Sequence, residues 1–216
     1  MLRSAVTRCA VLFVGVAALS VGVAVPCSVA AEEGLGTIRG EIEARGVRKP
    51  EDVLVFLEHV PGDHKPPADG VTMDQKKLTF DPHVLPIVKG TTVKFQNNDP
   101  LLHNVFWPKS RDSSYGAYNL GSWGTGAIRK YTFEDEGHVV LLCNIHPEME
   151  GHVVVLQNAF FAVTDEDGTY EIKNVPVGQY TLKTWYSNPK KLRSKSAQVT
   201  VQADKTTDQD FSLSRR

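Results

Sequence analysis

The sequence has no excess of charge of either sign. Its 24 Lys and Arg residues are balanced by 25 Asp and Glu residues, which gives a formal net charge of −1. A protein that binds nucleic acid normally presents a basic surface to the phosphates, and this composition does not provide one. We therefore expect no nucleic-acid partner.

Sustained helical periodicity is also missing after residue 31. The chain instead has 17 Gly, 12 Pro and many short runs rich in Val, Thr and Tyr. Such runs, separated by turn-forming residues, are typical of β-strands. The sequence therefore predicts an all-β protein.

Cysteine is scarce, and two of the three cysteines, Cys9 and Cys27, fall in the first 31 residues. Arg3 and Arg8 make the start of that segment basic. An apolar stretch follows that is short for a membrane-spanning helix. We interpret residues 1–31 as a signal peptide that is removed on export, rather than as a permanent anchor or a lipoprotein signal ending at Cys27. The expected location is the periplasm or the exterior, with no stable membrane insertion.

Cys143 is then the single cysteine of the mature chain. One cysteine cannot form an internal disulfide, so its thiol is either free or bound to a partner. A free thiol is easily oxidised in an exported protein. Binding to a metal ion is the simplest way of protecting it.

The sequence around this cysteine reads Cys143-Asn144-Ile145-His146-Pro147-Glu148-Met149. It supplies a thiolate, an imidazole and a thioether at intervals of three residues. One Cys, two His and a distant Met are the ligands of a blue-copper centre, and His103 is the candidate for the second histidine. Zinc would also accept Cys and His, but Met is a poor zinc ligand, so the pattern favours copper.

The block from Val71 to Gln157 resembles a cupredoxin. The resemblance is carried by the Cys-x-x-His-x-x-Met loop, which is most similar to the short loop of amicyanin, and by three further stretches: Phe80-Asp81-Pro82, Val88 to Phe95, and Asn98 to Val105. It implies a Greek-key β-sandwich. It also implies one mononuclear type 1 copper ion with the ligands His103, Cys143, His146 and Met149.

The resemblance implies further roles around this site. Asn104 would link the two ligand-bearing loops, and His146 would reach the surface within an apolar docking patch formed by Leu101, Leu102 and Pro147. The protein would carry one electron between a redox donor and an acceptor, for which an amine dehydrogenase and a c-type cytochrome are candidates. We expect no enzyme, because Leu142 and Asn144, not histidines, flank Cys143. Copper buffering or delivery, and a non-redox scaffolding role with a vestigial copper domain, are the alternatives.

A second module follows residue 157. Residues 160–164 and 169–172 flank Asp165-Glu166-Asp167-Gly168, which predicts a β-hairpin. The pattern is similar to carboxypeptidase-regulatory-like modules, which are small transthyretin-like β-sandwiches. Such modules open with two strands, and the matching strands here lie at residues 36–58.

These observations predict a copper domain inserted into a transthyretin-like sandwich. The expected divisions are a signal peptide at 1–31, the first part of the sandwich at 34–60, the copper domain at 71–157 and the second part of the sandwich at 158–214. In the alternative arrangement, residues 34–60 would extend the cupredoxin sheet.

The remaining histidines are interpreted as solvent-facing or edge-strand residues by default. Of these, His138 and His152 lie near the ligand loop in sequence, so a supporting role behind the copper ligands is the alternative for both.

Overall fold

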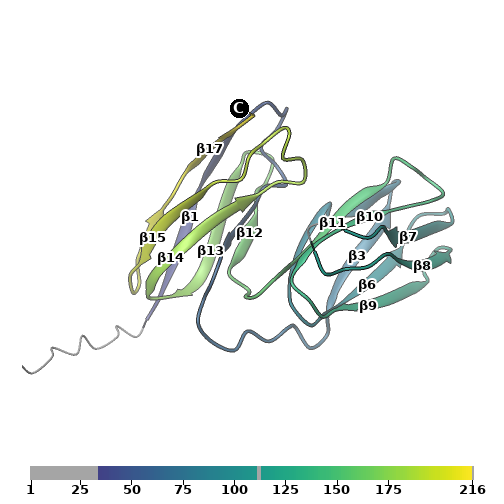
Figure 1. Ribbon diagram of the computed structural model, residues 1–216, viewed down its shortest axis with the longest axis horizontal. Coiled ribbons are helices and arrows are strands. Elements are labelled where there is room, and N and C mark those ends of the chain that lie inside the picture. The colour runs from purple at the N-terminus through teal and green to yellow at the C-terminus, as the bar shows by residue number, and fades with distance from the viewer. Residues whose placement is uncertain (1–33, 111–112, 216) are drawn as a thin grey trace, which may run out of the picture. The chain divides into compact units, whose positions relative to one another are not determined.

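The computed structural model describes residues 34–110 and 113–215. All regular elements in these ranges are strands, seventeen in number, so the predicted all-β class is confirmed. The strands form four sheets that make two sandwiches (Figure 1). Within the described ranges, no helix has the length and apolar character needed to cross a membrane. The predicted signal peptide, residues 1–31, lies outside them.

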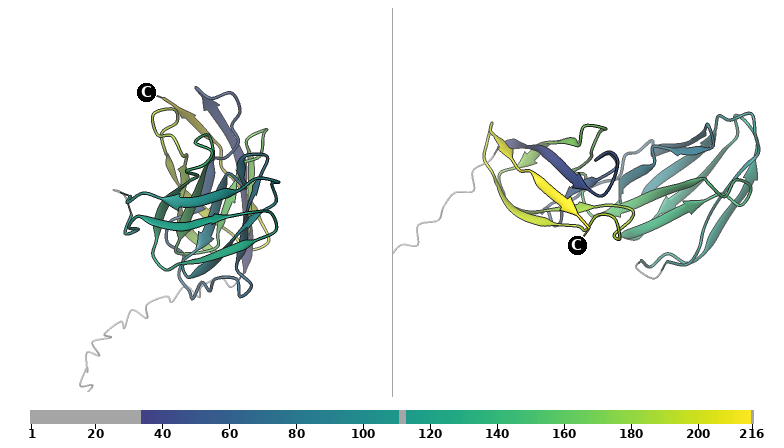
Figure 2. Two further views of the ribbon diagram at one scale, coloured as in Figure 1. Left: turned by 90° about the vertical axis from the view of Figure 1, so that its right-hand side faces the viewer. Right: turned by 90° about the horizontal axis from the view of Figure 1, so that it is seen from above.

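The first sandwich, here called the copper sandwich, holds the nine strands between residues 71 and 156. These are β3 (Val71–Lys76), β4 (Thr79–Asp81), β5 (Val84–Val88), β6 (Thr91–Asn97), β7 (His103–Trp107), β8 (Tyr118–Trp123), β9 (Ile128–Phe133), β10 (Gly137–Leu142) and β11 (Glu150–Leu156). One sheet has the order β4-β3-β6-β9 and the other has the order β5-β11-β10-β7-β8. Figure 2 shows the same sheets from two further directions.

The core of the copper sandwich follows from the alternation of side chains along its strands. In β6, Val93 and Phe95 are fully buried, while Thr92, Lys94 and Gln96 are partly exposed. This is the period of two expected of a half-buried strand. They pack with Trp107 and Leu141 from the opposite sheet. Cys143 and Met149 belong to the same cluster, so the ligand loop rests directly on this core.

Strand β11 is buried on both faces. Val153 and Val155 point into the core of the copper sandwich. Val154 and Leu156 point the other way and form a separate cluster with Leu54, which belongs to the second sandwich. A nearly continuous apolar run is what a strand covered on both sides requires.

The second sandwich combines strands from both ends of the described chain. Its strands are β1 (Leu35–Arg45), β2 (Leu54–Leu57), β12 (Phe161–Val163), β13 (Thr169–Pro176), β14 (Gly178–Trp185), β15 (Ser196–Val201), β16 (Thr206–Asp208) and β17 (Phe211–Ser214). One sheet has the order β13-β1-β16, with β17 also pairing with β1, and the other has the order β12-β2-β14-β15. Thus β1 and β2, which precede the copper sandwich in sequence, pair with strands that follow it.

The predicted hairpin around Asp165 to Gly168 is wrong in one respect. The chain does turn there, and Gly168 donates a backbone hydrogen bond of 3.1 Å to Asp165. The flanking strands do not pair with each other, however: β12 pairs with β2 and β13 pairs with β1, in different sheets. The strands before residue 60 provide hydrogen-bonding partners for both, so the turn connects the two layers.

Gly40 in β1 provides a test of this packing. A Cβ atom at Gly40 would overlap the backbone carbonyl of Gln209, which precedes β17. We expect Gly40→Ala to lower the free energy of unfolding by about 1–3 kcal/mol, because backbone must move to accept the methyl group. Urea unfolding of the metal-free protein measures this change. Gly116→Ala is the matched control, since nothing lies within 4 Å of a Cβ atom there; equal effects of the two substitutions would contradict the packing.

Candidate metal centre

The four predicted ligands lie on two segments that one strand pair holds together. His103 is the first residue of β7, and Cys143 directly follows β10. Strands β7 and β10 are antiparallel neighbours, with Phe106 opposite Leu142. This pairing brings the two segments to one end of the sandwich although 40 residues separate them (143 − 103).

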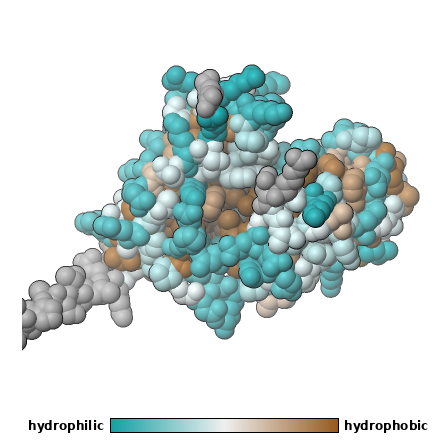
Figure 3. Space-filling view, in the orientation of Figure 1, coloured by the Kyte–Doolittle hydropathy of each residue, from teal (hydrophilic) through white to brown (hydrophobic). Residues whose placement is uncertain are grey.

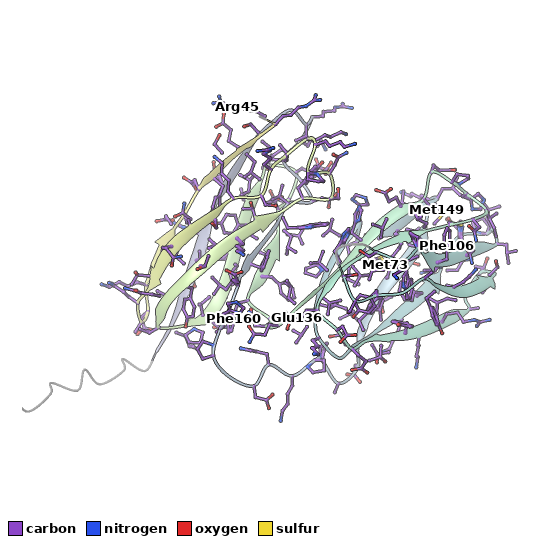
Figure 4. The ribbon with its side chains drawn as sticks, in the orientation of Figure 1. Arg45, Met73, Phe106, Glu136, Met149 and Phe160 are labelled. Atoms are coloured by element: carbon purple, nitrogen blue, oxygen red, sulfur yellow. The ribbon has the colours of Figure 1, made fainter. Side chains whose placement is uncertain are left out.

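His146 and Met149 lie in the loop that connects β10 to β11. The backbone N–H of Met149 donates a 3.0 Å hydrogen bond to the carbonyl of His146, which closes the loop into a tight turn. Figure 4 labels Met149 and Phe106 in the copper sandwich. Met149 is 1% exposed, so its side chain points inward.

Three of the predicted ligands converge. The ligand atoms of His103, Cys143 and His146 all lie within 4.8 Å of one another. The two Nδ1 atoms are 3.0 Å apart, and the Cys143 Sγ lies 4.0 Å from the Nδ1 of His146. Among the described residues this is the one set of His, Cys, Asp or Glu side chains that meets so closely.

The centre is closed on the inside and open at one edge. His103 is fully buried and Cys143 is 4% exposed, whereas His146 is only half-buried. A soft thiolate and two imidazoles in a dry setting, beside a buried thioether, are the donor set that copper prefers.

Asp99 fixes the orientation of His103. Its carboxylate accepts a 2.8 Å hydrogen bond from the His103 Nε2, so the proton is assigned to Nε2 and the lone pair of Nδ1 faces the centre. Burial alone would raise the pKa of Asp99. The backbone N–H groups of Leu78 and Lys77 and the His103 ring all hydrogen bond to its carboxylate and outweigh burial, so the pKa is lowered.

The sequence analysis assigned no role to Asp99. The available signal was its position four residues before a predicted ligand. That spacing alone cannot show that the chain between the two residues turns back on itself.

Asn104 connects the two ligand-bearing segments. Its Oδ1 accepts a hydrogen bond of 3.2 Å from the backbone N–H of Asn144, next to Cys143. Its Nδ2 donates to the Asn119 side chain and to the carbonyl of Gly121 on the neighbouring strand. Such outer contacts hold metal ligands in position.

Apolar side chains surround the exposed edge of the centre. Leu101 is 45% exposed and Leu102 is 52% exposed, and Pro147 is also exposed. Ile145 is also exposed, at 41%. Its place in this surface was not predicted from the sequence, because an apolar residue beside a ligand is usually part of the core. Figure 3 shows hydrophobic surface at the right-hand end of the molecule, where the copper sandwich lies.

The default interpretation of His152 as a surface or edge residue is wrong. His152 is 2% exposed and lies in β11, between β5 and β10. The alternating pattern of strands explains the error, because polar residues in such a pattern normally face solvent, whereas β11 is covered on both faces.

Two family models match parts of this chain. Residues 68–156 match the copper binding proteins of the plastocyanin/azurin family. Residues 148–214 match the carboxypeptidase regulatory-like domain. No curated protein matches the chain.

Among solved structures, the chain is similar to a Cu-containing nitrite reductase from Thermus scotoductus SA-01, with 27% identity over 48% of this chain and a TM-score of 0.39. The chain spans about a quarter of that reductase, at 26% of its length. It is also similar to a mutant of amicyanin with Cu(I), with 21% identity, a TM-score of 0.37, and coverage of 47% of this chain and 97% of amicyanin. By the two family models, residues 68–156 are similar to the copper binding proteins of the plastocyanin/azurin family, which indicates copper as the cofactor, and residues 148–214 are similar to the carboxypeptidase regulatory-like domain.

Proposed function

We propose that this protein is a periplasmic blue-copper electron carrier. The observation that supports this most strongly is the convergence of His103 Nδ1, Cys143 Sγ and His146 Nδ1 within 4.8 Å. These three residues would hold the copper ion, with Met149 as a weak fourth ligand. Bound there, copper would accept and release one electron.

The arrangement favours electron transfer over catalysis. A catalytic metal site keeps a coordination position open to substrate. Here His103 is fully buried and Cys143 nearly so, and Met149 is buried beside them. Leu142 and Asn144 flank Cys143, so no neighbouring histidine would connect the site to a second copper centre.

The electron would enter and leave through the half-buried His146. The apolar surface of Leu101, Leu102, Ile145 and Pro147 suits the small, short-lived interfaces of redox proteins. The exposed Glu148 next to it favours a partner with positive charge at its docking surface. An amine dehydrogenase and a c-type cytochrome remain the proposed classes of partner.

We also propose that the copper sandwich is an insertion, with the divisions at 34–60, 71–157 and 158–214. The pairing of β1 and β2 with strands after residue 160 supports it. The proposed location rests on the leader-like composition of residues 1–31 and on the single remaining cysteine.

The ligand assignment predicts the effect of Cys143→Ala. A thiolate bound to Cu(II) gives an intense visible absorption, and this band should disappear when the thiolate is removed. Visible and electron-spin spectra of the copper-loaded protein measure this. A band that persists in the variant would show that another residue is the thiolate donor.

The role of Asp99 predicts the effect of Asp99→Asn. Both carboxylate oxygens of Asp99 now accept hydrogen bonds. The substitution replaces one of these oxygens by an NH₂ group, which cannot accept a hydrogen bond, so one buried donor loses its partner. We expect the metal-free protein to lose about 1–3 kcal/mol of stability, and copper affinity to fall by roughly tenfold or more because His103 loses its orientation. Urea unfolding and competition with a copper chelator measure the two effects. Glu148→Gln, on the exposed side of the ligand loop, is the control; unchanged copper affinity in Asp99→Asn would remove Asp99 from the site.

The docking surface predicts the effect of Leu102→Asp. The substitution should leave the visible spectrum intact and slow electron self-exchange by roughly tenfold, because two charged surfaces must then approach each other. Line broadening in nuclear magnetic resonance of mixed Cu(I) and Cu(II) protein measures the rate. Leu35→Asp is the matched control, since Leu35 is 50% exposed on the second sandwich. Equal self-exchange rates in the two variants would place the docking surface elsewhere. Slow self-exchange in the unaltered protein would instead favour copper storage over electron transfer.

A further inference from the structure

Positive charge on the second sandwich is concentrated on one loop. The loop between β14 and β15, residues 186–195, has no acidic residue and four basic ones, Lys190, Lys191, Arg193 and Lys195. All four side chains are exposed. Because the whole chain has a formal net charge of −1, this excess of positive charge is local.

The end of β17 adds a fifth cation. The backbone N–H of Arg193 donates a hydrogen bond of 3.3 Å to the carbonyl of Ser214, the last residue of β17, so Arg215 follows directly beside the loop. An open hollow of about 310 Å³ is lined by Pro189, Lys190, Arg193 and Arg215. The loop and the end of β17 therefore form one surface, here called the basic edge.

The acidic side chains nearby lie on the other edge of the sandwich or are paired. The acidic turn at residues 165–167 joins β12 to β13, whereas the basic edge joins β15 and β17, which lie across the two sheets from them. Within that turn, Glu166 forms an ion pair of 2.6 Å with Lys49. Glu43, which lies beside β17, is paired at 2.9 Å with Arg45, labelled in Figure 4.

The five cations of the basic edge are not neutralised by the rest of the molecule. In the ranges 34–110 and 113–215, no carboxylate forms an ion pair with any of these five side chains. Like charges that are held close together repel one another. A negatively charged partner would remove this repulsion.

The loop that carries these charges is anchored. Leu192 is 1% exposed and packs in the core of the second sandwich. The carbonyl of Asn188 accepts hydrogen bonds from the backbone N–H groups of Lys191 and Leu192, at 3.0 and 3.1 Å. The backbone N–H of Lys195 donates a hydrogen bond of 2.8 Å to the Oγ1 of Thr184. The fixed backbone therefore presents the charged side chains outward.

The composition of the basic edge favours a membrane over a protein as its partner. The centre of a protein interface is normally apolar, but no described residue in 186–195 or after 210 is a strongly exposed large apolar side chain. Three of the five cations are lysines, whose flexible point charges suit a fluid layer of headgroups better than one fixed carboxylate. Close to an anionic lipid surface, each Lys or Arg strengthens binding by roughly fivefold.

We propose that the basic edge, formed by Lys190, Lys191, Arg193, Lys195 and Arg215, binds the surface of a membrane that contains anionic phospholipid. The contact is electrostatic and reversible. It does not involve insertion into the hydrocarbon layer, because the described residues of the basic edge offer no exposed large apolar side chain to insert. The proposal does not rest on copper binding or on electron transfer.

Flotation of the copper-loaded protein with vesicles tests the proposal. Vesicles of mixed phosphatidylglycerol and phosphatidylcholine should carry the protein, whereas vesicles of phosphatidylcholine alone should not. The triple variant Lys190→Gln, Arg193→Gln and Arg215→Gln should bind the anionic vesicles at least roughly tenfold more weakly. Added salt should weaken the binding of the unaltered protein, because it screens the charges.

The matched control is the triple variant Arg39→Gln, Lys173→Gln and Lys205→Gln. It removes the same amount of charge from exposed positions elsewhere on the second sandwich. Its binding to anionic vesicles should stay within about twofold of that of the unaltered protein, because distant surface charges are screened. The visible copper spectrum should be the same in both triple variants, since all six substitutions lie outside the copper sandwich.

Two soluble anions separate a membrane from other partners. Neither inorganic phosphate nor polyglutamate, at a concentration of charge equal to that of the anionic lipid, should displace the protein from the vesicles. The proposal is overturned if anionic vesicles do not carry the unaltered protein or if the two triple variants lose binding equally. It is also overturned if polyglutamate or phosphate displaces the protein, which would indicate an acidic protein or free phosphate as the ligand.

Discussion

The metal centre depends on the hydrogen bonds that join the segment at residues 99–104 to the loop at residues 143–149. Strands β7 and β10 bring the two segments side by side, and Asn104 accepts the backbone N–H of Asn144. Asp99 then turns His103 so that its Nδ1 faces the other donors. Because these contacts are made within a packed core, the donors are already in place before an ion arrives, and a rigid set of ligands keeps reorganisation small when copper gains or loses an electron.

Strand β11 connects this centre to the rest of the molecule. It begins directly after Met149, and its inner face fills the core beneath the ligand loop. Its outer face carries His152 and packs Val154 and Leu156 against the second sandwich. A strand that is covered on both faces cannot shift register without exposing apolar side chains. The packing of β11 on its inner and outer faces therefore fixes the position of the ligand loop.

Several features of the fold and of the site could be predicted from residue pattern alone. The short runs rich in Val, Thr and Tyr between turn-forming residues predicted the all-β class, and the spacing of Cys143, His146 and Met149 identified the ligand loop. The pairing of β12 was predicted wrongly, because a turn sequence specifies reversal of the chain and not the partner of each strand. The burial of His152 and the contact of Asp99 with His103 were missed for the same reason: each depends on a neighbour that is distant in sequence or on a turn that the pattern does not reveal.

The sequence by itself determined which chemical groups are present and how the local chain is built: strands and turns, one cysteine after residue 31, and a loop with three soft or borderline metal ligands. The tertiary structure decided which of these groups meet. His103 approaches His146 through the pairing of β7 with β10, and Lys190, Arg193 and Arg215 gather because the loop after β14 is hydrogen bonded to the end of β17. The physical reason is that side-chain type follows from the sequence, whereas proximity follows from burial and from hydrogen bonds between segments far apart in it.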